Sequence, residues 1–181
     1  RVLSIFAAIL PSTGNLVVEK SITVPSSGGF GDVALSNDGK NTLLAFTRTS
    51  GFFFEISLAR ISNSTHDLID TQPKTISTPG GVRFAPALAF NGTRTLAVWI
   101  NQQANSLVVA GRFIDAGEVE PKNDIFPIYD SGRFALQPAL ASDKKNGFLM
   151  AWNELATENY DQNLYGKLIG DDGSLSVYDP M

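Results

Sequence analysis

The sequence predicts an all-β protein made of β-propeller blades, each a sheet of four antiparallel strands. Three tetrapeptides, which begin at Val33, Pro86 and Pro138, align with one another almost without gaps. Each leads through a polar turn into an apolar segment that ends in an aromatic residue, at positions 46, 99 and 152. The interval is 53 residues both times, which is the length of one four-stranded blade.

The first strand of each repeat is small and apolar on both faces, as in residues 87–90. This suits a strand packed between neighbouring sheets near a crowded axis, so we expect it to lie innermost. The turns that follow, at 37–40, 91–94 and 143–147, carry the Asn and Gly residues that tight hairpins require. The second strand then ends on the recurring aromatic residue.

A third strand is expected around 6–9, 58–61, 110–113 and 165–168, and a basic residue recurs in it, as Arg60, Arg112 and Lys167. A short fourth strand is expected around 22–24, 76 and 126–128. A link that contains glycine then returns the chain to the axis. The basic residues could form an anion-binding ring, but outer strands favour packing on aromatic rings or pairing with acids.

These elements predict four blades: the end of a first at 1–30, a second at 31–84, a third at 85–136 and a fourth at 137–181 that lacks its last strand. The total is about three and a half blades, which would leave two apolar sheet faces bare. We therefore expect part of a larger propeller. The alternatives are a homo-oligomer with a shared ring and an open two-sheet β-structure.

Composition limits the partners. With 43% hydrophobic and 18% charged residues, the chain is predicted to be ordered. The net charge of −4 disfavours nucleic acid, and the longest apolar run, Ile5–Leu10, is too short to span a membrane. There is no cysteine, which excludes disulfides and cysteine-based metal sites. We expect no cofactor and no metal.

The pattern Pro-Ala-Leu-Ala, polar turn, Leu-x-Val-Trp and then Gly-Arg-Phe, best seen at 86–117 and 138–173, resembles a repeat of secreted bacterial and archaeal β-propeller proteins. The segment 35–40 is also similar to a turn of TolB-type propeller repeats, with Asn37 where those have proline. The resemblance implies an extracellular or cell-surface location. It implies architecture rather than activity, because propellers of this sort bind proteins, carry glycan-active sites or serve as spacers.

Catalytic signals are weak. His66, the only histidine, is predicted to be a solvated turn residue, so no catalytic residue is assigned. A glycosidase needs two carboxyl groups about 5 to 10 Å apart. The loop after the last aromatic residue is the richest in such groups and is a candidate binding segment, with Glu154, Glu158, Tyr160 and Asp161. Turn chemistry explains the acidic residues at 37–41 and 171–173 better than calcium does.

The repeated aromatic residues Phe46, Trp99 and Trp152 are predicted to pack between blades. Phe52 and Phe54 belong to a run of three phenylalanines, of which at least one must face outward, and we predict a contact with another chain or blade. Glycosylation triplets begin at Asn63 and Asn91, both in predicted turns.

Two functions are compatible with these observations. The first is a non-catalytic interaction or structural module of an extracellular or cell-surface protein, which binds a protein partner or assembles with further blades. The alternative is a fragment of a glycan-binding or glycan-hydrolysing propeller enzyme, in which the acidic loop at 153–161 lies at the mouth of the axis. Enzymatic activity is left open by the sequence.

Overall fold

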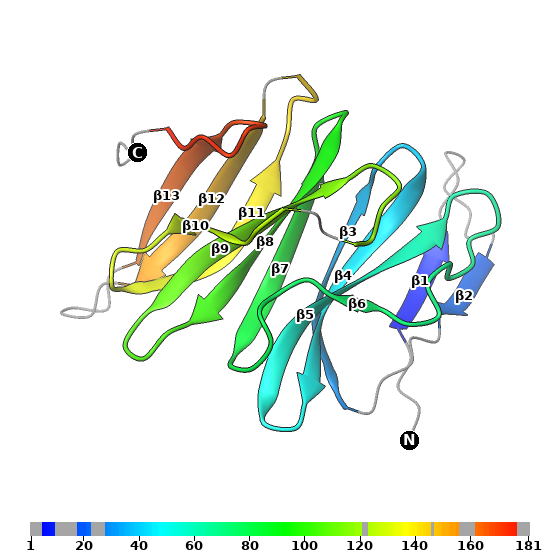
Figure 1. Ribbon diagram of the computed structural model, residues 1–181, viewed down its shortest axis with the longest axis horizontal. Coiled ribbons are helices and arrows are strands. Elements are labelled where there is room, and N and C mark those ends of the chain that lie inside the picture. Colours follow the sequence, from blue (N-terminus) through cyan, green and yellow to red (C-terminus); the bar gives the residue numbers. More distant parts are fainter. Residues whose placement is uncertain are drawn as a thin grey trace.

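The computed structural model describes residues 5–9, 18–22, 28–120, 123–145, 147–155 and 162–176 (Figure 1). These residues form thirteen β-strands and contain no helix, so the all-β prediction is confirmed. Nothing among them could therefore cross a bilayer as an apolar helix. The strands are β1 (Ile5–Ile9), β2 (Val18–Ile22), β3 (Phe30–Asn37), β4 (Asn41–Ser50), β5 (Phe53–Ser62), β6 (Lys74–Thr75), β7 (Arg83–Phe90), β8 (Arg94–Gln102), β9 (Leu107–Asp115), β10 (Phe126–Tyr129), β11 (Phe134–Ala141), β12 (Phe148–Leu155) and β13 (Gln162–Ile169).

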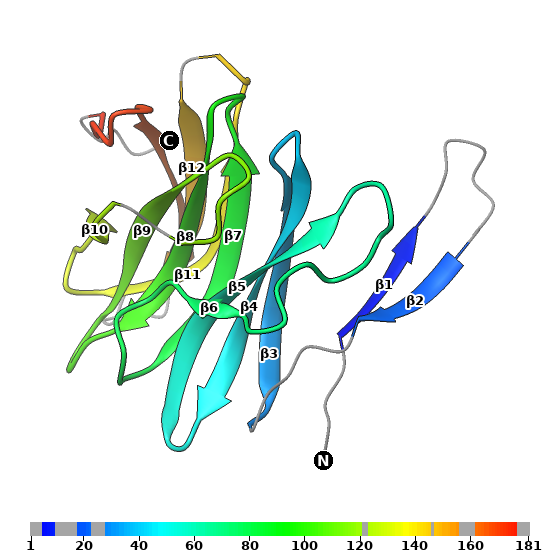
Figure 2. The ribbon, with the colours of Figure 1, turned by 45° about the vertical axis from the view of Figure 1, so that its right-hand side comes forward.

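Within each sheet, strands that follow one another in sequence pair antiparallel. They give the β3–β6 sheet in the order β3-β4-β5-β6, the β7–β10 sheet in the order β7-β8-β9-β10 and the β11–β13 sheet. One parallel residue pair, Phe134 with Leu107, joins the last two sheets edge to edge. In both views the β1–β2 hairpin lies on the side of the β3–β6 sheet that faces away from the β7–β10 sheet (Figures 1 and 2).

The links that lead into β3 and β7 are held in the same way. The N–H of Thr49 donates to the carbonyl of Gly29 and, 53 residues later, the N–H of Gln102 donates to the carbonyl of Val82, both at 2.9 Å. These bonds tie the returning link to the end of the second strand. The 53-residue interval therefore recurs in the backbone hydrogen bonds as well as in the sequence.

Two apolar layers hold the sheets together. Trp99 lies between the β3–β6 and β7–β10 sheets among Leu43, Leu58 and Ala110, and it is 1% exposed. Trp152, also 1% exposed, lies between the β7–β10 and β11–β13 sheets. Each tryptophan thus faces the preceding sheet. This equivalence follows from strand alternation, because residues 53 positions apart occupy the same side of the same strand.

Phe46 takes the same place in the β3–β6 sheet and faces away from the β7–β10 sheet. It is completely buried and meets the ring of Phe30 edge-on, with 5.4 Å between ring centroids. Leu44 and Ala59 share this layer. The three repeated aromatic residues therefore lie on corresponding faces of three successive sheets.

Two of the three basic residues make a repeated contact between sheets. Arg112 donates from Nη1 to the carbonyl of Ile76 in the preceding sheet at 3.1 Å, and Lys167 donates from Nζ to the carbonyl of Ile128 at 3.1 Å. Arg112 lies opposite Ala97 and Lys167 opposite Met150, which are 53 residues apart. Each cation therefore binds a backbone carbonyl in or directly after the fourth strand of the preceding sheet.

The grouping of Arg60 with these two residues is wrong. Arg60 lies opposite Leu43, on the other face of its sheet, because the β3–β6 copy is one residue out of register in the third strand. Its guanidinium pairs instead with Asp70, with 2.6 Å between Nη2 and Oδ1, and donates to the carbonyl of Gly117 at 2.6 Å. The hydrogen bond with Asp70 raises the pKa of Arg60 above its ordinary value.

Candidate functional site

Each of the strands β3, β7 and β11 is irregular close to its start. Their pairing register shifts between Phe30 and Val33, between Phe84 and Ala87 and between Leu136 and Ala139, so one extra residue is accommodated each time. Such β-bulges re-aim side chains and are frequent beside active sites. We call this end of the sheets the bulge end. The opposite end, where these three strands turn into β4, β8 and β12, is the turn end.

Asp32, Ala85 and Gln137 occupy the same position in the three bulges, directly before Val33, Pro86 and Pro138. The φ angles of Ala85 and Gln137 are 51° and 48°, in the left-handed region that residues with a side chain rarely adopt. Non-glycine residues in this region cost free energy and gather at functional sites. Repetition of the feature in two strands indicates that the fold, rather than either residue, imposes it.

The carboxylate of Asp32 joins two inner strands. Its Oδ2 accepts the backbone N–H of Ala85 at 2.9 Å, while the side chain as a whole is exposed. Strand β7 packs against β3 on one side and against β11 on the other. Gln137, at the start of β11, therefore lies at the same end of the sheets as Asp32 and Ala85. Gln137 is also exposed and its Oε1 accepts a hydrogen bond from Nδ2 of Asn153 at 3.1 Å. The bulge end therefore presents a carboxylate and two amides to solvent.

Glu154, the one predicted binding residue of the acidic loop that the structure describes, also lies at the bulge end but is not exposed. The residue is 2% exposed and lies between the β7–β10 and β11–β13 sheets. Its Oε2 accepts hydrogen bonds from the hydroxyls of Tyr129 and Ser131, the latter at 2.8 Å. Its Oε1 pairs with Nη1 of Arg133 at 3.3 Å. These partners compensate the burial of the charge, which is the arrangement of a structural carboxylate rather than of a free acid or base.

Tyr129 completes an aromatic cluster around this carboxylate. Its ring lies 4.4 Å from that of Trp152 and 6.3 Å from that of Tyr165, between centroids. Burial, followed by the hydrogen bond to Glu154, raises the pKa of Tyr129 to about 12. The phenol therefore stays neutral well above the pH at which an exposed tyrosine ionises.

The raised pKa predicts a loss of stability in alkali. The neutral form is favoured in the folded protein, so this contribution is complete below the ordinary tyrosine pKa of 10.0 and is lost as pH rises to about 12. Urea unfolding from pH 8.5 to 11.5 should show a steeper fall in the free energy of unfolding for the wild type than for Tyr129→Phe. Parallel pH profiles of the two proteins would contradict the assignment.

The β4–β5 hairpin carries the run of phenylalanines and lies at the bulge end. Phe52 stands in its turn with 96% of its surface exposed, and Phe53 and Phe54 are 49% and 38% exposed. The backbone N–H of Phe54 donates to the carbonyl of Gly81 at 2.9 Å, which anchors the hairpin to the adjacent link. The structure thus brings Phe52 and Phe54 to the same end as Glu154. Glu158, Tyr160 and Asp161 lie outside the described residues.

The remaining predicted residues lie at the turn end. Asn63 is exposed in a turn, as glycosylation requires. Asn91 is 5% exposed and its Oδ1 accepts the N–H groups of Thr93 and Arg94 at 3.0 Å, so its burial disfavours a glycan there. His66 lies in a turn with φ of 59°. In the described ranges no three His, Asp or Glu side chains are close enough together to hold a metal ion.

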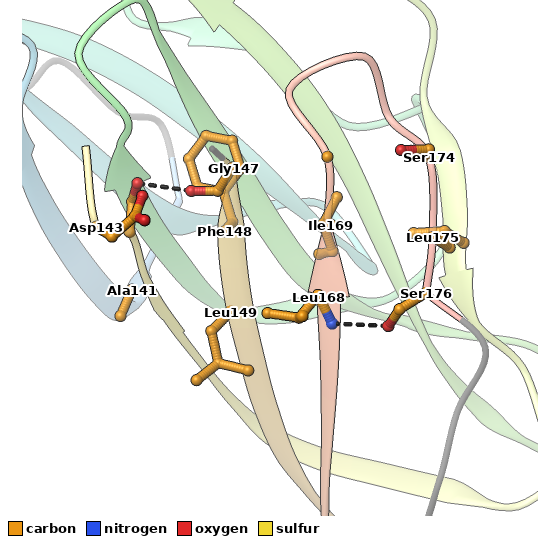
Figure 3. Close-up of a pocket in the computed structure, with 12 residues that line it drawn as sticks. Ala141, Asp143, Gly147, Phe148, Leu149, Leu168, Ile169, Ser174, Leu175 and Ser176 are labelled. Atoms are coloured by element: carbon orange, nitrogen blue, oxygen red, sulfur yellow. Dashed lines mark hydrogen bonds between the residues drawn. The ribbon is translucent and has the colours of Figure 1, made fainter. Parts of the chain in front are cut away.

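A hollow of about 750 Å³ lies on the outer face of the β11–β13 sheet, near the turn end (Figure 3). Phe148, Leu149, Leu168, Ile169 and Leu175 line it together with serine and glycine residues. Leu149 and Leu168 are 50% and 60% exposed and lie opposite one another across β12 and β13. Asp143 supplies the single carboxylate of the lining, so the hollow is apolar rather than catalytic in character.

Asp32, Ala85 and Gln137 are not among the site residues predicted from the sequence. Each of them stands one position before one of the aligned tetrapeptides. The next residue is proline in two copies, and the third copy has an acid at this position, so the sequence contains a weak signal for it. A left-handed backbone at a non-glycine residue has no comparable signature in sequence.

The stacked four-stranded antiparallel sheets define a β-propeller fold, with its inner strands starting at the bulge end. No family model and no curated protein sequence matches the chain. Solved structures do. It is similar to an endo-arabinase from Bacteroides thetaiotaomicron VPI-5482, with a TM-score of 0.67 and 11% identity over 92% of this chain and 68% of that one.

Two further structures resemble it at the same level. An endo-1,4-β-xylanase from the same organism has a TM-score of 0.62 and 13% identity, covering 95% of this chain and 66% of its own. A thermostable family-43 glycoside hydrolase has a TM-score of 0.60 and 11% identity, covering 97% and 70%. The chain thus spans about two thirds of the length of these proteins.

These findings correct the first of the two predicted functions. A non-catalytic interaction or structural module was expected, whereas the structurally similar proteins reported above are glycoside hydrolases. The comparison favours the alternative, a glycan-active propeller. The error arose because the repeat pattern is dictated by packing between sheets, which carries no information on the chemistry at their ends.

Proposed function

We propose that the chain is part of a glycan-active β-propeller and that the glycan binds at the bulge end, in contact with Asp32. The observation that carries this proposal is the row of bulges at the starts of β3, β7 and β11, two of them strained, which presents Asp32 and Gln137 to solvent. Carboxylates and amides are the groups that bind sugar hydroxyls, because they can accept and donate several hydrogen bonds.

The blade boundaries at 30, 84 and 136 belong to the same proposal, as does an extracellular or cell-surface location, where such substrates are found. The outer face of the β11–β13 sheet supports a further blade. Leu149 is half exposed, whereas Leu96, 53 residues earlier, is fully buried under the next sheet. Because the two preceding interfaces use this same position, the occupant that fits is another sheet of the same repeat.

Asp32→Asn tests the proposal. The amide keeps an oxygen that can accept the N–H of Ala85, so the fold should survive, while the charge is lost. We expect the wild type to bind soluble arabinan or xylan and to release reducing ends from it. The variant should release reducing ends on the order of a hundredfold more slowly. Asp143→Asn, at the turn end, is the matched control and should behave as the wild type.

Two outcomes would contradict the assignment. If neither polysaccharide retards the wild type in affinity electrophoresis and neither is cleaved, the chain is not glycan-active towards these substrates at this end. If Asp143→Asn and Asp32→Asn lose binding to the same extent, the effect is one of overall charge rather than of position.

A further inference from the structure

The most exposed large apolar side chain among the described residues is Phe52, at the tip of the β4–β5 hairpin. Exposure of 96% of an aromatic side chain is costly in water. Phe53, beside it, is half exposed. The tip is held in place because Phe54 bonds to the carbonyl of Gly81, so the rings are presented on an anchored turn.

The repeat does not require these rings. The corresponding hairpin between β8 and β9 has the sequence Gln103-Ala104-Asn105-Ser106, which is polar and contains no aromatic residue. Apolar residues that pack between sheets lie within the paired parts of the strands, as Leu96 and Leu43 do, whereas Phe52 lies in the turn beyond them. A neighbouring sheet of the same kind would therefore leave Phe52 uncovered.

The position of the tip relative to the bulge suggests what covers it. Arg48 pairs with Phe30 at the start of β3, and β4 continues for two more residues to Ser50 before the turn that carries Phe52. The tip therefore projects past the bulge by about 7 Å of strand plus the turn itself. A single sugar ring cannot reach from Asp32 to Phe52. A glycan of several units can contact both.

We propose that the Phe52 ring is a stacking platform for one sugar unit of an extended glycan chain whose other units lie over Asp32. The apolar C–H face of a sugar ring is complementary to the electron-rich face of an aromatic ring. This inference rests on the proposed function and adds a substrate class to it: polymers and long oligosaccharides rather than mono- or disaccharides.

Four variants of the whole chain test the platform: Phe52→Ala, Phe52→Leu, Phe52→Trp and, as a control, Leu149→Ala on the outer face of β12. Binding is measured by titration with xylan and arabinan and with xylobiose and arabinobiose. We expect Phe52→Ala and Phe52→Leu to weaken polysaccharide binding by about threefold to tenfold, as the loss of one aromatic contact predicts. Phe52→Trp and Leu149→Ala should bind as the wild type, and disaccharide binding should be the same in all five proteins.

Other outcomes overturn the platform. Wild-type affinity in Phe52→Leu would show that any apolar side chain suffices. If Phe52→Ala weakened the binding of polysaccharide and disaccharide equally, the platform would not be specific for long glycan chains. If Asp32→Asn abolishes cleavage while Phe52→Ala leaves it and binding unchanged, the platform fails and the proposed function stands. If the wild type binds no glycan, both fail. A change of molecular mass in Phe52→Ala would instead make the tip a contact between copies.

Discussion

Replacement of Trp99 by alanine should lower the free energy of unfolding by about 3 to 5 kcal/mol. The indole is 1% exposed and fills the layer between two sheets, against Leu43 and Leu58 of one and Ala110 of the other. Neither sheet can close the resulting cavity alone, because each is held by its own strand pairing. Urea unfolding followed by circular dichroism measures the effect.

Phe52→Ala is the control, since it removes an aromatic ring that makes no buried contact. Its effect should lie within about 0.5 kcal/mol of zero. Trp152→Ala, at the corresponding position one sheet later, should resemble Trp99→Ala. A loss below about 1 kcal/mol for both tryptophan variants would show that the sheets do not depend on one another for their stability.

Replacement of Asp38 by alanine should cost about 3 kcal/mol, because it leaves three backbone N–H groups without an acceptor. Asp38 is 2% exposed, although it belongs to a hairpin turn. Its Oδ1 accepts the N–H groups of Lys40 and Asn41 at 2.9 and 2.6 Å, and its Oδ2 accepts the N–H of Gly117 in the next sheet at 2.7 Å. The carboxylate thus shapes one turn and ties it to another.

Asp172→Ala is a suitable comparison for Asp38→Ala. Asp172 also lies in a hairpin turn, but it is exposed and its hydrogen-bond partners are local: Oδ1 accepts the N–H of Ser174 at 2.8 Å, and the side chain of Ser174 is a further partner. This variant should unfold at nearly the same urea concentration as the wild type. Equal losses for the two aspartates would mean that the contact with Gly117 contributes nothing and that the turn alone accounts for the effect.

The sheet architecture could be predicted from the sequence because packing repeats. Residues that fill the space between sheets must recur at the same place in each copy, and Phe46, Trp99 and Trp152 do so at a constant interval. The residues of the tight turns predicted the strand ends for the same reason. Residues such as Asn37 and Asn91 are needed wherever two strands meet in a tight hairpin.

The register of the third strand could not be predicted equally well. Arg60 was matched to Arg112 by residue type, but a loop of different length precedes it, and strand pairing places it one position away. A shift of one residue moves a side chain to the opposite face of a sheet. Arg60 accordingly pairs with an acid of its own sheet, whereas Arg112 contacts the preceding one.

The candidate site was predicted only in part, since its features depend on three-dimensional structure. Glu154 was predicted to lie in a binding loop, whereas it lies within β12 and is buried. Its partners Tyr129 and Arg133 come from segments more than twenty residues away, which the sequence does not reveal. Asp32 stands directly before an aligned tetrapeptide, but an acid at this position in one copy of three does not by itself mark a site. What singles it out is a bulge, which only the pairing register reveals.

Amide chemical shifts recorded during titration with long arabinan or xylan oligosaccharides test the central claim most directly. The account predicts that the largest changes occur at the bulge end, at Asp32, Ala85 and Gln137 and along the hairpin at Phe52. Changes confined to the turn end or to the outer face of β12 and β13, or no changes with either glycan, would contradict it.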